Sequence, residues 1–275
     1  LAYAKYLHVV DTEQLNSLNS TSSLTIESLP DSGYYVVSLP ANGKAILDIA
    51  KVGADYQPGH AHADTLSFEL SLFGKRFIVN SGVSEYGLGS LRLLQRGTIA
   101  HTTVNVNSKN SSEIWHGFRV ARRANPKLQL LEKNLCEVSV QGSHDGYRLL
   151  DPLLRHSRLW QFTANSLLVT DNISVDATEN EARYYFHPMV VIEKQVDAIN
   201  CYLDNNLVCI KLGGAQSILL EESFWYPGFG KKCANKCLVV KFHKRELQTH
   251  GEVIDCFISF LSRFMCWFFS FESVG

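Results

Sequence analysis

Three histidines and an aspartate are spaced so that they could bind a metal ion or exchange protons. His60, His62 and Asp64 stand at alternate positions where a strand-like run begins, and His101 stands at the start of a later run. Successive side chains of an extended strand point to opposite faces, so the first three would share one face. Imidazole ligates borderline metals and titrates near neutral pH. The row therefore predicts a metal site or an acid–base site.

The elements that must position these residues are strands. Runs rich in β-branched and aromatic residues alternate with turn residues at intervals of roughly ten positions, which is typical of sandwiches. Asn42-Gly43 predicts a hairpin, and residues 88–96 form the best short helix. We therefore predict a mainly β fold, a large antiparallel β-sandwich. The predicted strands are 34–39, 45–50, 65–72, 76–79, 101–106, 118–120, 128–131, 135–141, 157–162, 167–173, 183–186, 190–193, 207–212, 217–220 and 237–242.

Composition and charge exclude some classes of protein. The chain has 275 residues, 45% of them hydrophobic, which suffices for one large all-β domain or two small domains. Its net charge of −1 provides no overall field for nucleic acid, so we expect no nucleic-acid partner. The seven cysteines cannot all pair within the chain. Cys233 and Cys237 lack a second ligand pair at finger-like spacing, which favours buried or idle thiols over a zinc knuckle.

The chain divides into three segments that differ in residue composition and pattern. We expect residues 1–28 to be a linker or the remnant of an upstream domain, 29–255 to be the sandwich, and 256–275 to be an atypical apolar tail. The apolar run from Cys256 to Phe271 carries Arg263 near its middle. Because a membrane span needs roughly 20 uninterrupted apolar residues, a buried strand pair or a tail foreign to the domain is favoured over an anchor.

Several motifs occur in an order that resembles a known family. They are PDSGYYVV (30–37), GHAHADTLSFEL (59–70), GKRFIVNSGVSEY (74–86), RGTIAHTTV (96–104), SEIWHGFRVARR (112–123), HDGYRLLDPLLRHSR (144–158) and WYPGFG (225–230). The series is similar to the C-terminal β-sandwich domain of the heparinase II/III-like polysaccharide lyases. The resemblance implies an α/α-toroid domain in front of the sandwich, and the segment before residue 29 is too short to contain one. This chain alone is therefore expected to be inactive.

The resemblance also implies an activity and a set of site residues. Members of the heparinase II/III-like family cleave uronic-acid-containing polysaccharides, glycosaminoglycans among them, by β-elimination. The resemblance therefore suggests an acidic polysaccharide as partner and a periplasmic or secreted location. His60 would be the catalytic or charge-neutralising residue, and His62 and His101 would bind a divalent metal, possibly zinc. The third ligand position holds Asn80 where the family has Asp, and a neutral amide is a weaker zinc ligand than a carboxylate.

Four further residues are candidates for substrate binding, each with an alternative interpretation. Tyr86 could stack on a sugar or pack in the core. Arg96 and Arg119 could hold carboxylates or sulfates, or form a solvated basic face. His144 could lie in the groove or on the plain surface.

Two other functions remain open at this stage. The sandwich could bind glycans, or serve as a structural domain, without cleaving them. It could also be a metal-binding structural module unrelated to sugar.

Overall fold

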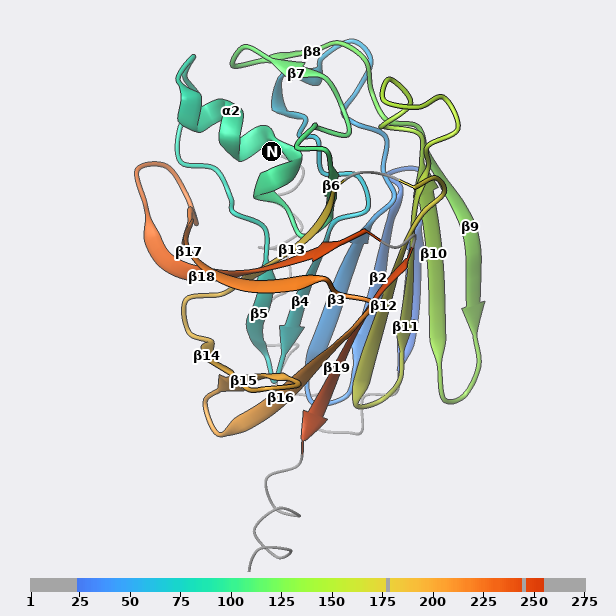
Figure 1. Cartoon of the computed structure of the whole chain (residues 1–275), viewed down its shortest axis with the longest axis vertical. Helices are drawn as coiled ribbons and strands as arrows, with labels where there is room; N and C mark the ends of the chain where they lie inside the picture. Colours follow the sequence, from blue (N-terminus) through green and yellow to red (C-terminus); the bar gives the residue numbers. More distant parts are fainter. Residues whose placement is uncertain (1–23, 177–178, 244–245, 255–275) are drawn as a thin grey trace, which may run out of the picture.

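The computed structural model describes residues 24–176, 179–243 and 246–254, which form two large antiparallel sheets (Figure 1). The first has the order β1-β2-β3-β4-β5-β13-β18-β17, and β6 also pairs with β13. The second has the order β14-β15-β16-β19-β12-β11-β10-β9. The predicted antiparallel β-sandwich is therefore confirmed.

The described elements have the following bounds. The first sheet contains β1 (Thr25–Leu29), β2 (Tyr34–Leu39), β3 (Gly43–Asp48), β4 (Phe68–Leu72), β5 (Lys75–Val79), β6 (Val104–Val106), β13 (Asn180–Phe186), β17 (Ser217–Trp225) and β18 (Cys233–Phe242). The second contains β9 (Pro126–Lys133), β10 (Val138–His144), β11 (His156–Phe162), β12 (Ser166–Ile173), β14 (Val191–Lys194), β15 (Ile199–Leu203), β16 (Asn206–Gly213) and β19 (Glu246–Ile254). Outside the two sheets are η2 (Pro58–His60), α2 (Ser90–Arg96), η3 (Thr98–Ala100) and the hairpin of β7 (Ile114–Trp115) and β8 (Arg119–Val120).

The hairpin turns follow the local sequence. Ala41 and Asn42 between β2 and β3 both have positive φ, 53° and 56°. Phe73 and Gly74 between β4 and β5 have φ of 56° and 73°. Two consecutive positive φ values match the type of two-residue turn whose twist agrees with that of the flanking strands. The predicted Asn42-Gly43 hairpin is confirmed.

The core lies between the two sheets. In β11, every second residue from His156 to Phe162 is buried, as the period of a strand requires. Trp160 on β11 is fully buried, and its ring meets that of Phe68 on β4 edge-to-face, with centroids 6.3 Å apart. Aromatic contacts of this geometry add about 0.5–1.5 kcal/mol beyond the burial of area. They hold the two layers in register.

Some boundaries differ from those predicted. The sheet begins at Thr25, inside the segment expected to be a linker. Strands β15 and β19 were not predicted; β19 is rich in polar residues and contains Gly251. The predicted helix is present but shorter, at Ser90–Arg96. The apolar tail at 256–275 lies outside the described residues. Within the described part of the chain, no helix is long and apolar enough to cross a membrane.

The two ends of the sandwich differ in character. Helix α2 and the β7–β8 hairpin lie together at one end, at the top of Figure 1, and β19 ends at the other. Near that second end, the sheets enclose a cavity of about 220 Å³ between residues such as Leu39, Phe73 and Val253. Among the described residues, no charged side chain lines this cavity.

Candidate metal and catalytic site

The loop that carries the histidine pair does not form the expected strand. Pro58 is the first residue of the 3-10 turn η2, which ends at His60, and the Ala61 N–H donates to the Pro58 carbonyl at 3.0 Å. Proline fixes φ and has no N–H for a sheet ladder, which explains the turn. His60 and His62 consequently face different neighbours. The His60 ring is exposed and packs edge-on against Tyr86, with centroids 5.1 Å apart, whereas His62 turns toward His101.

His62, Asp64 and His101 form a group that could hold a metal ion. Their ligand atoms all lie within 4.8 Å of one another. His62 Nδ1 and His101 Nε2 are 3.0 Å apart, and His101 Nδ1 is 2.7 Å from the Gly97 carbonyl oxygen. A carbonyl only accepts, so His101 carries its proton on Nδ1, which leaves the Nε2 lone pair facing His62. An imidazole that donates its other N–H to a carbonyl is the arrangement found in metal-binding histidines.

The protonation states of the two histidines also suit metal binding. Burial lowers the pKa of His62 well below its usual value, and the charges of His101, Arg92 and Arg96 lower it further. Burial lowers the pKa of His101 too, although Asp64 and the Gly97 carbonyl act in the opposite direction. Both rings are therefore neutral at pH 7, the form that ligates metals. Two neutral imidazoles and one carboxylate fit a divalent metal such as zinc.

Asn80, the predicted third ligand, lies beside this group with other partners. Its Oδ1 accepts the Thr102 N–H at 2.9 Å, and its backbone and side chain hydrogen-bond to the Glu69 carboxylate. Asp64 is the carboxylate that the structure brings together with the two histidines. The alternate spacing of His60, His62 and Asp64 in the sequence also indicates Asp64 as a candidate site residue.

The four predicted substrate-binding residues are divided between surface and interior. Tyr86 is 47% exposed, and Arg119 is exposed with its guanidinium carbon 5.1 Å from the centre of the Trp115 ring. Arg96 is fully buried, and its guanidinium donates to the carbonyls of Ala61, His116 and Arg119 at 3.0, 2.9 and 3.4 Å. It therefore ties the histidine loop to the β7–β8 hairpin.

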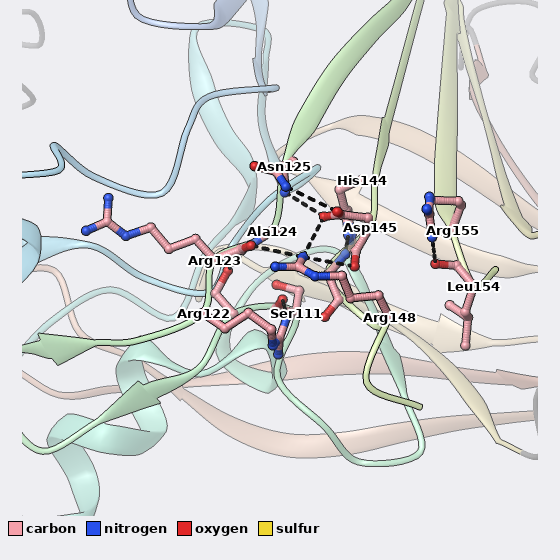
Figure 2. A network of polar contacts seen from close by, with 12 residues as sticks. Ser111, Arg122, Arg123, Ala124, Asn125, His144, Asp145, Arg148, Leu154 and Arg155 are labelled. Carbon is pink, nitrogen blue, oxygen red and sulfur yellow. Dashed lines mark hydrogen bonds and ion pairs between the residues drawn. The ribbon is translucent and has the colours of Figure 1, made fainter. Parts of the chain in front are cut away.

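His144 lies in the interior, away from the exposed residues. It is 2% exposed; its Nδ1 accepts the Gly146 N–H at 2.9 Å, and its Nε2 is 3.2 Å from His156 Nδ1. Figure 2 shows His144 next to Asp145, which forms an ion pair with Arg148. His156 Nε2 is in turn 2.7 Å from Asp171 Oδ1.

A buried arginine connects this interior network to the candidate site. Arg158 on β11 donates to both carboxylate oxygens of Asp171, at 2.7 and 2.9 Å. Its Nη1 also donates to the carbonyls of Leu66 and Thr102, at 2.9 and 2.7 Å. Leu66 follows the loop of His62 and Asp64, and Thr102 follows His101. One side chain from the second sheet thus holds both ligand-bearing segments, an anchor that the sequence did not reveal.

A second set of contacts supports the same loop from the other side. Arg122 Nη1 donates to the carbonyls of Ser111 and Gly146, at 3.2 and 2.5 Å; Arg122 and Ser111 are labelled in Figure 2. Ser111 Oγ and Thr98 Oγ1 both donate to the Ala63 carbonyl, at 3.3 and 2.7 Å. Ala63 lies between His62 and Asp64, so the backbone of the candidate site is fixed on both sides.

These features define an all-β sandwich with a histidine–carboxylate group at one end, and comparison with known proteins places it in a family. The sequence profile described as heparinase II/III-like, C-terminal, matches residues 21–254. The chain therefore belongs to the heparinase II/III-like family through its C-terminal domain. A comparison with curated proteins finds no match.

Solved structures show the same fold. A crystal structure of heparinase III has a TM-score of 0.69 at 18% identity, covering 86% of this chain and 37% of that one. The heparan sulfate lyase HepC from Pedobacter heparinus has a TM-score of 0.70 at 18% identity, covering 92% and 41%. The heparinase III BT4657 gene product has a TM-score of 0.68 at 15% identity, covering 92% and 40%. This chain thus spans about two fifths of the length of those structures.

Proposed function

We propose that this chain is the β-sandwich part of a polysaccharide lyase that cleaves uronic-acid-containing glycans by β-elimination. Family membership and the fold shared with a heparan sulfate lyase support the class of substrate. The observation that carries the proposal is the position of His60. Its ring is exposed beside Tyr86, at the edge of the group formed by His62, Asp64 and His101.

The reaction requires a proton to leave the carbon next to the uronate carboxylate. The electron pair then forms a carbon–carbon double bond, the bond to the leaving sugar oxygen breaks, and that oxygen takes up a proton. Histidine is suited to such transfers because it titrates near neutral pH. We assign His60 to proton transfer or to neutralisation of the developing charge. Tyr86 would orient the sugar ring beside it.

The histidine–carboxylate group would serve as the metal site. His62, Asp64 and His101 would hold a divalent ion, possibly zinc, with Asn80 adjacent. When bound, the ion supplies positive charge near an anionic substrate. Tyr86 and Arg119 are exposed and would contact the glycan directly, whereas the buried Arg96 and His144 would act by holding the surrounding segments. An upstream helical domain would complete the groove in the whole protein.

The test is cleavage by the protein expressed from its complete gene. A panel of uronic-acid polymers would be followed by the ultraviolet absorbance of the unsaturated product. We expect His60→Ala to abolish the signal and His250→Ala, a half-buried histidine on β19, to leave it unchanged. A folded wild-type protein that gives no absorbance on any polymer would rule out the lyase.

A glycan-binding domain without activity is the second candidate, and Asn80 favours it. A neutral amide stands where the family resemblance implies a carboxylate, and its oxygen already accepts the Thr102 N–H. Binding of acidic glycans without cleavage, together with a gain of metal affinity in Asn80→Asp, would select this candidate. Cleavage by the wild-type protein would exclude it.

A further inference from the structure

Two arginines in helix α2 are buried without an acidic partner. Arg92 and Arg96 stand one helical turn apart, and both have 0% exposure. Neither forms an ion pair with any described carboxylate. Arg158, which is equally buried, has the Asp171 carboxylate against the Nε–Nη2 edge of its guanidinium. A buried charge without a counter-ion is costly, so this pair of cations requires an explanation.

The two arginines differ in how their hydrogen-bonding groups are used. Every guanidinium nitrogen of Arg96 donates to a backbone carbonyl. Arg92 has only two longer contacts, from Nε to the Gly117 carbonyl at 3.3 Å and from Nη2 to the Gly59 carbonyl at 3.4 Å. Its Nη1 is buried and has no hydrogen-bond partner. Arg92 therefore retains both an uncompensated charge and an unused donor.

The surroundings of this donor point to a sugar as ligand. The guanidinium carbon of Arg92 lies 4.9 Å from the ring centre of Tyr86 and 6.0 Å from that of Phe118. Phe229 packs against Tyr86, with ring centroids 4.7 Å apart. Tyr86, Phe118 and Phe229 are 47%, 41% and 60% exposed, and the exposed ring of His60 touches Tyr86. Aromatic faces bind the apolar faces of pyranose rings, and guanidinium groups bind carboxylate and sulfate.

We propose that Arg92 is the anion-binding residue of this site and takes the carboxylate or sulfate group of an acidic sugar. The sugar ring stacks on the exposed rings of Phe118 and Phe229, and rotation of the Tyr86 side chain, which lies over the Arg92 guanidinium, admits the anionic group to Nη1. The inference rests on the proposed function for its class of ligand, since an acidic glycan is the substrate assigned to His60. It adds the residue that recognises the charge.

Binding of small anions tests this without any need for cleavage. The 275-residue chain would be titrated calorimetrically with glucuronate, inorganic sulfate and glucose. We expect glucuronate or sulfate to bind and glucose not to bind, and the two anions separate recognition of carboxylate from that of sulfate. Arg92→Gln should lower the affinity for the anion at least about tenfold, because one hydrogen bond between charged groups is lost.

Arg155→Gln is the matched control. Arg155 also forms no ion pair with a described carboxylate and donates to the Pro152 and Leu154 carbonyls, at 2.8 and 2.9 Å (Figure 2), but it is exposed and directly precedes β11 of the second sheet. The affinity of Arg155→Gln for the anion should stay within about twofold of wild type. If Arg92→Gln does not fold, Arg92→Lys keeps the charge without the planar fork, and it should bind more weakly than wild type.

The outcomes separate this inference from the proposed function. Unchanged anion affinity in folded Arg92→Gln or Arg92→Lys, or no anion binding by wild type, would overturn the inference and leave the lyase assay to decide activity. Anion binding that depends on Arg92 would uphold it even where no polymer is cleaved. Binding by the 275-residue chain but not by the complete gene product would overturn it in favour of an acidic side chain from a covering polypeptide.

Discussion

The ion pair between Arg158 and Asp171 should be the most sensitive point in the sandwich. Both side chains have 0% exposure, and Asp171 accepts two hydrogen bonds from Arg158 and one from His156. Asp171→Asn keeps the shape but leaves the Arg158 cation in the core without a counter-charge. Removing one partner of a buried pair costs about 3–5 kcal/mol. A typical domain has a free energy of unfolding of about 5–15 kcal/mol, so the loss should be large.

Urea denaturation followed by tryptophan fluorescence would measure the effect, because Trp160 lies beside the Arg158 guanidinium, 5.9 Å from its ring centre to the guanidinium carbon. Lys75→Met is the control. Lys75 pairs with Asp204 on the surface, with side chains 42% and 47% exposed, where such a pair contributes about 0–1 kcal/mol. Equal losses of unfolding free energy for Asp171→Asn and Lys75→Met would refute the reasoning.

The same pair has a defined pH dependence. Burial alone would raise the pKa of Asp171, but the charge of Arg158 and the hydrogen bonds from His156 and Arg158 outweigh it and hold the pKa at about 2. The folded-state pKa is below the unfolded value, so the carboxylate stabilises the fold fully above about pH 4. That contribution, about 2 kcal/mol, should disappear as the pH falls toward 2. Asp171→Asn should lack this acid transition.

Three further predictions concern other parts of the structure. Burial keeps the pKa of His144 well below its usual value, so its contribution to stability should be constant above about pH 6.5 and fall by up to about 1.4 kcal/mol per pH unit below it. Urea titrations at several pH values should show that His144→Gln reduces the slope of stability against pH by this amount. His101→Ala should lower the zinc affinity of the chain at least about tenfold in a competition assay with a chromophoric chelator, and unchanged metal content would exclude this site. Gly82→Ala should destabilise the fold by more than the roughly 1–3 kcal/mol of a strained φ, because its Cβ would meet the Tyr226 carbonyl oxygen at 2.1 Å, whereas Gly230→Ala, with a similar φ of 66° and nothing within 4 Å, should cost only the strain.

Much of the fold follows from local sequence signals. The run Tyr34–Leu39 alternates in burial as its residue types predict, and the Asn42-Gly43 turn adopts the required positive φ at Asn42. Sequence signals do not predict strand β19, because its sequence is polar and lacks a strong strand pattern. Its place in the sheet comes from backbone hydrogen bonds to β12 on one side and β16 on the other. Pairing of that kind is a property of the assembled sheet.

The candidate site was predictable in its residue types and less so in its geometry. His62 and His101 were expected to meet, and their ring nitrogens are 3.0 Å apart. The strand expected from His101 begins only at Val104, because the preceding segment is held by η3 and by the bond from Thr102 to Asn80. The metal-binding roles assigned to His62 and His101 stay predictions.

The interior partners were not predictable. Arg158 belongs to the motif at 144–158, but nothing in that motif indicates that it reaches two carbonyls in the segments that precede β4 and β6. Arg92 had one usable signal, its four-residue spacing from Arg96 in the predicted helix, which places both on one helix face. Burial of that face could be seen only in the folded structure.

The backbone of Tyr226 joins two distant parts of the rim around His60. Its N–H donates to Ser81 at 2.7 Å, its carbonyl accepts from Val83 at 3.2 Å, and the Gly230 N–H donates to Ser84 at 3.0 Å. The tip of the β17–β18 hairpin, which carries Phe229, is therefore hydrogen-bonded to the segment that leads to Tyr86. Movement of the hairpin main chain would break these three hydrogen bonds, so entry of a ligand on this side must depend on rotation of side chains.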